Sequence, residues 1–134
     1  MIEAQGGIPR LLPIARDDRA SLEMVFDLAK GADIVVTIGG ASVGDYDLVG
    51  KVAAERGMDR AFYKVAMRPG KPLMAGRLDG AMMIGLPGNP VSAFVGFEVF
   101  VRNTLERLGG LSDGGRLTVH ARCEDAILSD GRES

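Results

Sequence analysis

The sequence predicts an α/β fold in which helices cover a parallel sheet. The first observation is a continuous, mostly β-branched run at residues 33–38, bounded by glycine, which is typical of a strand buried on both faces. The second is the alternation of such runs with segments whose apolar residues recur at helical spacing. The third is the glycine content, 19 of 134 residues, which indicates tight turns and close backbone approaches.

The composition limits the class of protein. A chain of 134 residues fits one ordinary domain and is too short for a barrel enzyme. Its 16 Lys and Arg against 18 Asp and Glu give a net charge of −2, which disfavours nucleic acid as a partner. The single cysteine, Cys123, allows neither an internal disulfide nor a thiolate zinc cluster. No apolar run approaches the ~18–20 residues of a membrane span, so we expect no membrane partner.

Local signals set the order of the elements. Asp17 or Asp18 is the expected N-cap of the first helix, Asp79-Gly80 is a hairpin signal, and Asn89 with Pro90 is the start of the longest helix. In order, the sequence predicts a strand at 8–14, a helix between 18 and 31, a strand at 33–38, a helix between 47 and 57, strands at 61–67, 72–78 and 81–86, a helix from 90 to about 108, and a strand at 116–124.

The first candidate site is the glycine-rich loop 39–47, between a strand and a helix, where ligands bind in open α/β sheets. Its Gly40, Ser42 and Gly44 also match G-x-S-x-G, so a serine hydrolase using Ser42 stays open, although the sole histidine, His120, lies within an expected strand. Asp47 has two interpretations. It caps the following helix, or it holds Mg²⁺ beside a phosphate. Asp17 carries the same ambiguity.

Two further segments point to anions. Residues 60–77 contain five cations and no acid, which indicates either a solvated face or an oxyanion site. Within them, Arg68 and Lys71 flank a rigid Pro-Gly turn. The segment Leu86-Pro-Gly-Asn-Pro90 predicts a rigid turn that caps a helix and aims its N-terminus at a ligand.

Together these segments resemble the molybdopterin molybdenumtransferase family, the group of bacterial MoeA and the gephyrin E-domain. The resemblance rests on GGASVGDYD at 39–47, KVAMRPGKP at 64–72 and GLPGNPVSA at 85–93, and it runs from about residue 6 to 110. It implies a three-layer α/β/α sandwich with a mostly parallel sheet over residues 1–110, lacking its N-terminal strand and helix. Residues 111–134 would begin a C-terminal β-barrel domain.

The resemblance also implies a function. Family members insert molybdate into adenylylated molybdopterin and release AMP, using a divalent cation such as Mg²⁺, and they work as cytoplasmic homodimers. A molybdopterin adenylyltransferase is the implied pathway partner. The implied catalytic residues are Asp47, Lys64 and Lys71, and the implied metal ligands are Asp47 and Asp17. The implied substrate-binding residues are Gly39, Gly40, Ser42, Gly44, Arg68, Pro87, Gly88, Asn89 and Pro90.

Two expectations complete the analysis. Both ends of the sequence predict a piece of a longer polypeptide, because MIEAQGG resembles the last turn of a helix and a lone final strand cannot bury its face. We therefore expect the 134-residue chain alone to be inactive and marginally stable. The alternative function is a non-catalytic scaffold or partner-binding module of the same fold, which would not need Asp47 or Lys71.

Overall fold

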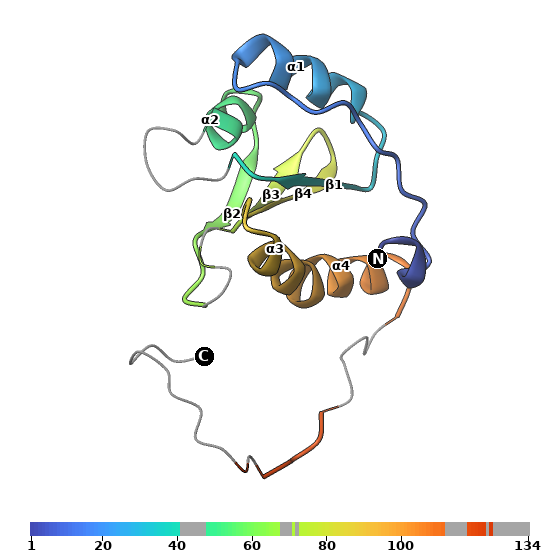
Figure 1. Cartoon of the computed structure of the whole chain (residues 1–134). Helices are drawn as coiled ribbons and strands as arrows, with labels where there is room; N and C mark the ends of the chain where they lie inside the picture. The colour runs from blue at the N-terminus through green and yellow to red at the C-terminus, as the bar shows by residue number, and fades with distance from the viewer. Residues whose placement is uncertain (41–47, 68–70, 72, 112–117, 123, 125–134) are drawn as a thin grey trace.

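A computed structural model describes residues 1–40, 48–67, 71, 73–111, 118–122 and 124 (Figure 1). The elements are η1 (Glu3–Gln5), α1 (Arg19–Leu28), β1 (Ile34–Ile38), α2 (Leu48–Glu55), β2 (Asp59–Tyr63), β3 (Met74–Leu78), β4 (Ala81–Leu86), α3 (Pro90–Gly96), η2 (Phe97–Val101) and α4 (Arg102–Leu108). In the described part of the chain, no helix is both long enough and apolar enough to span a membrane.

The expected three-layer α/β/α arrangement is confirmed. Helices α1 and α2 cover one face of a four-stranded sheet, and α3, η2 and α4 cover the other (Figure 1). The strand order is β1-β4-β3-β2. The β1–β4 pair is parallel, whereas β4–β3 and β3–β2 are antiparallel. The described sheet is therefore mixed rather than mostly parallel, because the Asp79-Gly80 turn joins β3 and β4 as a hairpin.

Each face of the sheet has its own core. The alternation of strand side chains assigns Met74 and Met83 to the core under α1 and α2, and Ala75 and Ile84 to the core over α3 and α4. Phe26 of α1 completes the first core and is 3% exposed. These two cores hold the strands in a fixed register, and that register positions the loops at the strand ends.

Two of the expected caps start helices. Asp18, and not Asp17, caps α1, because its Oδ1 accepts a hydrogen bond from the Ser21 amide at 2.8 Å. Asn89 caps α3 in the same way, since its Oδ1 accepts from the Ser92 amide at 3.1 Å. Each cap satisfies an amide that has no partner inside its helix.

The long helix from 90 to 108 contains a π-helical segment, η2, which the sequence analysis did not predict. Residues every fourth position, Ala93, Phe97, Val101 and Leu105, belong to the core or pack against it. Four residues of an α-helix turn about 40° more than one full turn, so over the three steps of this row the side chains would rotate about 120° away from the sheet. The wider turn of η2 takes up about one residue, or about 100°, and therefore keeps this row facing the sheet.

Three expected strand features are wrong. Residues 8–14 form no strand, and Ile8, Leu11 and Ile14 are 98%, 99% and 96% exposed, since no neighbouring strand pairs with them in the described residues. Strand β1 is not buried on both faces, because it lies at the edge of the sheet and Ile38 is 69% exposed. Residues 118–122, the described part of the expected final strand, also form no strand, because they pair with no other strand among the described residues.

Arg56 joins both helices of one face to the hairpin turn. Its guanidinium lies 2.7 Å from the Asp27 carboxylate, 3.5 Å from that of Asp79 and 5.9 Å from the centre of the Phe26 ring. Hydrogen bonds from Lys30 and Arg56 hold the pKa of Asp27 below its usual value. Because the lowered pKa belongs to the folded state, this contribution is present above the ordinary carboxyl pKa and is lost as the pH falls below about 4.

We expect Arg56→Ala to lower the free energy of unfolding by about 1–2 kcal/mol at neutral pH, since it removes two ion pairs and a cation–π contact from a partly buried group. The difference from wild type should shrink as the pH falls below about 4, because Asp27 becomes protonated and its ion pair with Arg56 is lost. Thermal melts of the intact gene product between pH 2.5 and 7 measure this. Arg77→Ala, which removes an exposed cation, is the control, and a pH-independent difference would contradict the interpretation.

Candidate functional site

The strand register brings three loops to one end of the sheet. A row of paired residues, Tyr63, Met74, Gly85 and Thr37, crosses all four strands. Just beyond this row lie the glycine turn after β1, the turn after β4 and the connection between β2 and β3. Three sequence segments that are far apart in the chain therefore lie at the same edge, at the left of Figure 1.

The turns after β1 and β4 contact each other through their backbones. The Gly39 amide donates a hydrogen bond to the Leu86 carbonyl at 3.0 Å. A Cβ placed on Gly88 would lie 3.5 Å from the Gly39 Cα, so the two glycines pack without intervening side chains. Gly40 follows with a φ of +70°, and a Cβ there would lie 2.4 Å from Cγ2 of Val49. Glycine at 40 therefore lets α2 pack directly on the turn.

The Leu86-Pro-Gly-Asn-Pro90 segment is the rigid turn that the sequence predicts. Pro87 is buried, whereas Gly88, Asn89 and Pro90 are exposed. Asn89 caps α3 with its side chain, and Pro90 occupies the first turn, where a missing amide hydrogen costs nothing. The exposed backbone of this turn faces solvent beside Gly39, where a ligand can approach it.

The hairpin that joins β2 to β3 brings Lys64 and Lys71 together at its base. The Lys64 amide donates to the Leu73 carbonyl at 2.9 Å, and the Val65 amide donates to the Lys71 carbonyl at 3.1 Å. Lys64 has a φ of +72°, a left-handed backbone conformation that residues other than Gly or Asn rarely adopt. Both lysine side chains are exposed. The backbone bonds thus place two cations at the same edge as the glycine turns.

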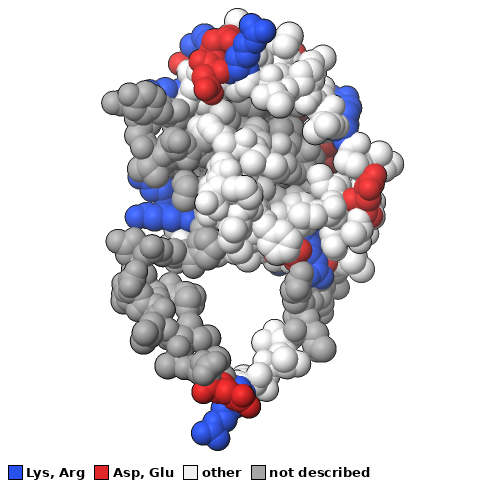
Figure 2. All heavy atoms as spheres, in the orientation of Figure 1, with Lys and Arg blue, Asp and Glu red and all other residues white. Residues whose placement is uncertain are grey.

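The edge is wide as well as basic. Strands β1 and β2 are the outermost of four, and three spacings of about 4.8 Å separate Gly39 from Lys64 by about 14 Å. Figure 2 shows Lys and Arg side chains on this side of the molecule, at the left of the view. Acidic and basic groups are mixed at the top of the same view, over α1 and α2.

Several expected site residues lie outside the described residues, namely Ser42, Gly44, Asp47 and Arg68. Asp17 is exposed and immediately precedes the cap of α1. Within the described part of the chain, no three His, Cys, Asp or Glu side chains gather as metal ligands would. His120 is exposed in the segment 118–122, so no described residue pair supports the serine-hydrolase alternative.

One polar residue at this edge escaped the sequence analysis. Thr37 was counted as a β-branched strand former, yet its Oγ1 is buried and has no hydrogen-bond partner among the described residues. The signal that would have singled out Thr37 is a polar residue two positions before a pair of glycines at the end of a strand.

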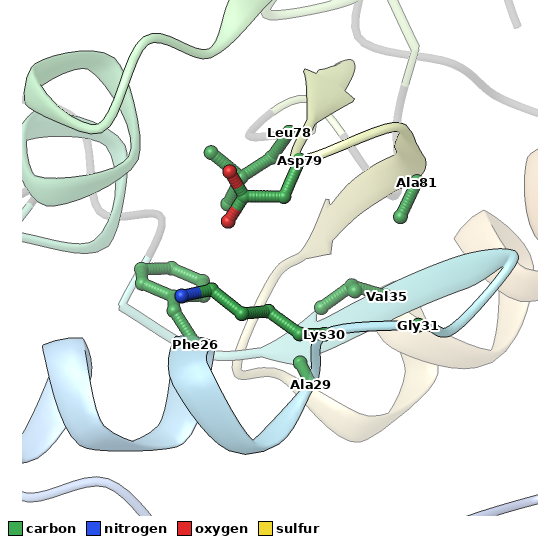
Figure 3. A pocket seen from close by; sticks show the side chains of 8 residues that line it. All are labelled: Phe26, Ala29, Lys30, Gly31, Val35, Leu78, Asp79 and Ala81. Atoms are coloured by element: carbon green, nitrogen blue, oxygen red, sulfur yellow. The ribbon is translucent and has the colours of Figure 1, made fainter.

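A small hollow at the opposite end of the sheet has a different character (Figure 3). It lies between the end of α1 and the β3–β4 turn, and Phe26, Lys30 and Asp79 are among its lining residues. It has room for no more than about one water molecule, far less than a ligand site needs. The basic edge with the glycine turns therefore remains the candidate site.

Comparisons with known proteins agree with this geometry. The family described as "Probable molybdopterin binding domain" matches residues 1–107. A molybdopterin molybdenumtransferase of Nostoc sp. is 37% identical over 137 residues, covering 98% of this chain and 31% of that protein. Molybdopterin molybdenumtransferase 2 of Mycobacterium tuberculosis is 46% identical over 105 residues, covering 74% of this chain and 26% of that protein.

A solved structure shows the same fold. The crystal structure of the molybdopterin biosynthesis MoeA protein from Pyrococcus horikosii superposes with a TM-score of 0.67 at 32% identity, and the match covers 81% of this chain and 27% of that one. The chain thus spans between about a quarter and a third of the length of these relatives. With a family match over most of its length and the expected fold in place, the chain belongs to the molybdopterin-binding domain family.

Proposed function

We propose that the protein acts in molybdenum cofactor biosynthesis as a molybdopterin molybdenumtransferase, inserting molybdate into adenylylated molybdopterin with release of AMP. The observation that carries the proposal is the meeting of the two glycine turns and the Lys64–Lys71 hairpin at one edge of the sheet. The names of the relatives support the same activity.

The charges of the substrates explain why such an edge suits this reaction. Adenylylated molybdopterin carries a pyrophosphate, and molybdate is a dianion, so the two repel each other. Lysines at 64 and 71 offset that repulsion, and the exposed backbone at Gly40 and Gly88 can donate hydrogen bonds to oxyanions. A lone oxyanion cannot reach across the about 14 Å between Gly39 and Lys64, whereas an extended substrate with a ring at one end and a nucleotide at the other can.

A divalent cation such as Mg²⁺ is part of the proposal. Mg²⁺ is held by one or two carboxylates and completes its shell with water and substrate phosphate oxygens. The exposed Asp17 carboxylate suits such a solvent-open site better than a closed protein cage. We propose Asp47 and Asp17 as its ligands. When bound, the cation would polarise the phosphoanhydride.

The proposal extends to assembly. We propose a cytoplasmic homodimer that receives its substrate from a molybdopterin adenylyltransferase. Two apolar side chains on α3 are exposed, Val91 at 64% and Phe94 at 55%, and they would suit a surface that contacts another subunit or domain.

We also propose that the open edge of β1 accepts another strand in the active protein. The edge carries no charged residue, its Ile38 is 69% exposed, and the apolar residues of the segment 8–14 are almost fully exposed. A strand at that edge would pair with the backbone of β1 that has no partner among the described residues.

The first prediction concerns the two lysines. In the intact gene product, Lys64→Ala and Lys71→Ala should each raise the KM for adenylylated molybdopterin about tenfold, because each removes a cation beside the pyrophosphate. The matched control is Arg77→Ala, which removes an exposed cation from the opposite end of β3 and should change KM less than about twofold. Equal effects of all three variants would show a general charge effect and contradict the assignment.

The second prediction concerns Asp47. Asp47→Ala should abolish metal-dependent release of AMP while adenylylated molybdopterin still binds, because the carboxylate acts on the cation rather than on the ring. Release of AMP and equilibrium binding are measured on the same preparation. Unchanged turnover defeats the assignment, and a protein whose partner binding tolerates both Asp47→Ala and Lys71→Ala is a scaffold instead.

The third prediction concerns the 134-residue chain alone. With the β1 edge open, we expect a broad, weakly cooperative thermal transition, because a strand paired on one side only makes few contacts that stabilise the sheet as a unit. We also expect no turnover. Calorimetry and an AMP assay test this. A sharp transition accompanied by AMP release would overturn the expectation.

A further inference from the structure

Among the described residues at the functional edge, Thr37 carries a polar group that makes no hydrogen bond within the fold. It is paired with Gly85 of β4 and lies in the row of residues just before the two glycine turns. Its hydroxyl oxygen is buried and has no hydrogen-bond partner among the described residues. A buried hydroxyl without a partner destabilises a folded protein, and a valine of the same shape would fill the position without that penalty.

The hydroxyl lies in a closely packed part of the sheet, beside Gly85. A Cβ placed on Gly85 would lie 3.3 Å from Thr37 Oγ1 and 3.2 Å from Met74 Cε, so the glycine leaves room for the hydroxyl. Two residues further on, the Gly39 amide bonds to the Leu86 carbonyl, the residue after Gly85. Thr37 therefore lies two residues before Gly39, where the two glycine turns meet.

We propose that Thr37 is a positioning residue whose hydroxyl gains its hydrogen bond only when an oxyanion, a phosphate or a molybdate, binds at the paired glycine turns, either directly or through one bridging water. This inference rests on the proposed function and deepens it. Without a ligand, the hydroxyl has no partner among the described residues and costs stability. In the bound protein it donates to the ligand, so the same group favours the bound state.

This arrangement predicts effects of opposite sign. Thr37→Val removes the unpaired hydroxyl and keeps the shape, so it should raise the melting temperature of the ligand-free protein by a few degrees. It should also weaken oxyanion binding about tenfold, the loss of one hydrogen bond to a charged group. Thr37→Ser keeps the hydroxyl and should bind as the wild type does. A purely structural threonine would change stability and leave affinity unchanged.

The experiment uses the intact gene product, wild type, Thr37→Val and Thr37→Ser, titrated separately with sodium molybdate and with AMP in a calorimeter, alongside ligand-free thermal melts. A tenfold loss in Thr37→Val for one of the two probes, rescued in Thr37→Ser, supports the proposal and identifies which oxyanion the hydroxyl serves. Equal affinities of wild type and Thr37→Val for both probes overturn the inference alone. A wild type that binds neither probe overturns the proposed function and this inference together.

Discussion

The candidate site depends on one close approach, the backbone contact between Gly39 and Gly88. Strands β1 and β4 are parallel neighbours, so both end at the same edge, and the Gly39 amide bonds to the Leu86 carbonyl where they end. A Cβ at Gly88 would lie at ordinary contact distance, 3.5 Å from the Gly39 Cα, and Gly39 has a φ of +83°, a conformation that favours glycine. Helix α2 packs on Gly40 of the first turn through Val49, and α3 begins directly after Asn89 of the second.

The opposite half of the site depends on hydrogen bonds and on strain. Two backbone bonds close the base of the β2–β3 hairpin and hold Lys64 in a left-handed conformation. That conformation costs on the order of 1–2 kcal/mol for a residue with a side chain, and the surrounding ladder must supply it. One half of the edge thus offers backbone amides and the other offers ammonium groups, a division that suits a long substrate with charges at separate positions.

Much of the fold followed from local signals in the sequence. The caps at Asp18 and Asn89, the hairpin at Asp79-Gly80 and the strand Ala81–Leu86 are short-range features, and the structure has them where the residues place them. The position of β1 in the sheet did not follow, because a β-branched run has the same composition whether or not a neighbour covers it. The left-handed Lys64 and the unpaired Thr37 hydroxyl also escaped, since both arise from tertiary contacts. The roles of all the expected site residues stay predictions, and Asp47 and Arg68 also lie outside the described residues.

The π-helical segment η2 has a consequence for how this helix tolerates changes in chain length. Deleting one residue between 97 and 101 would restore an uninterrupted α-helix and rotate everything after it by about 100°. Arg102 and Glu106, bonded at 2.7 Å, would turn together, whereas Arg102 would move away from Glu98, which it approaches at 3.8 Å, and Val101 would turn away from the sheet. Substitutions in this stretch alter one contact each, whereas an insertion or deletion would alter the phase of the whole helix, so the residue count here is under tighter constraint than the residue identities.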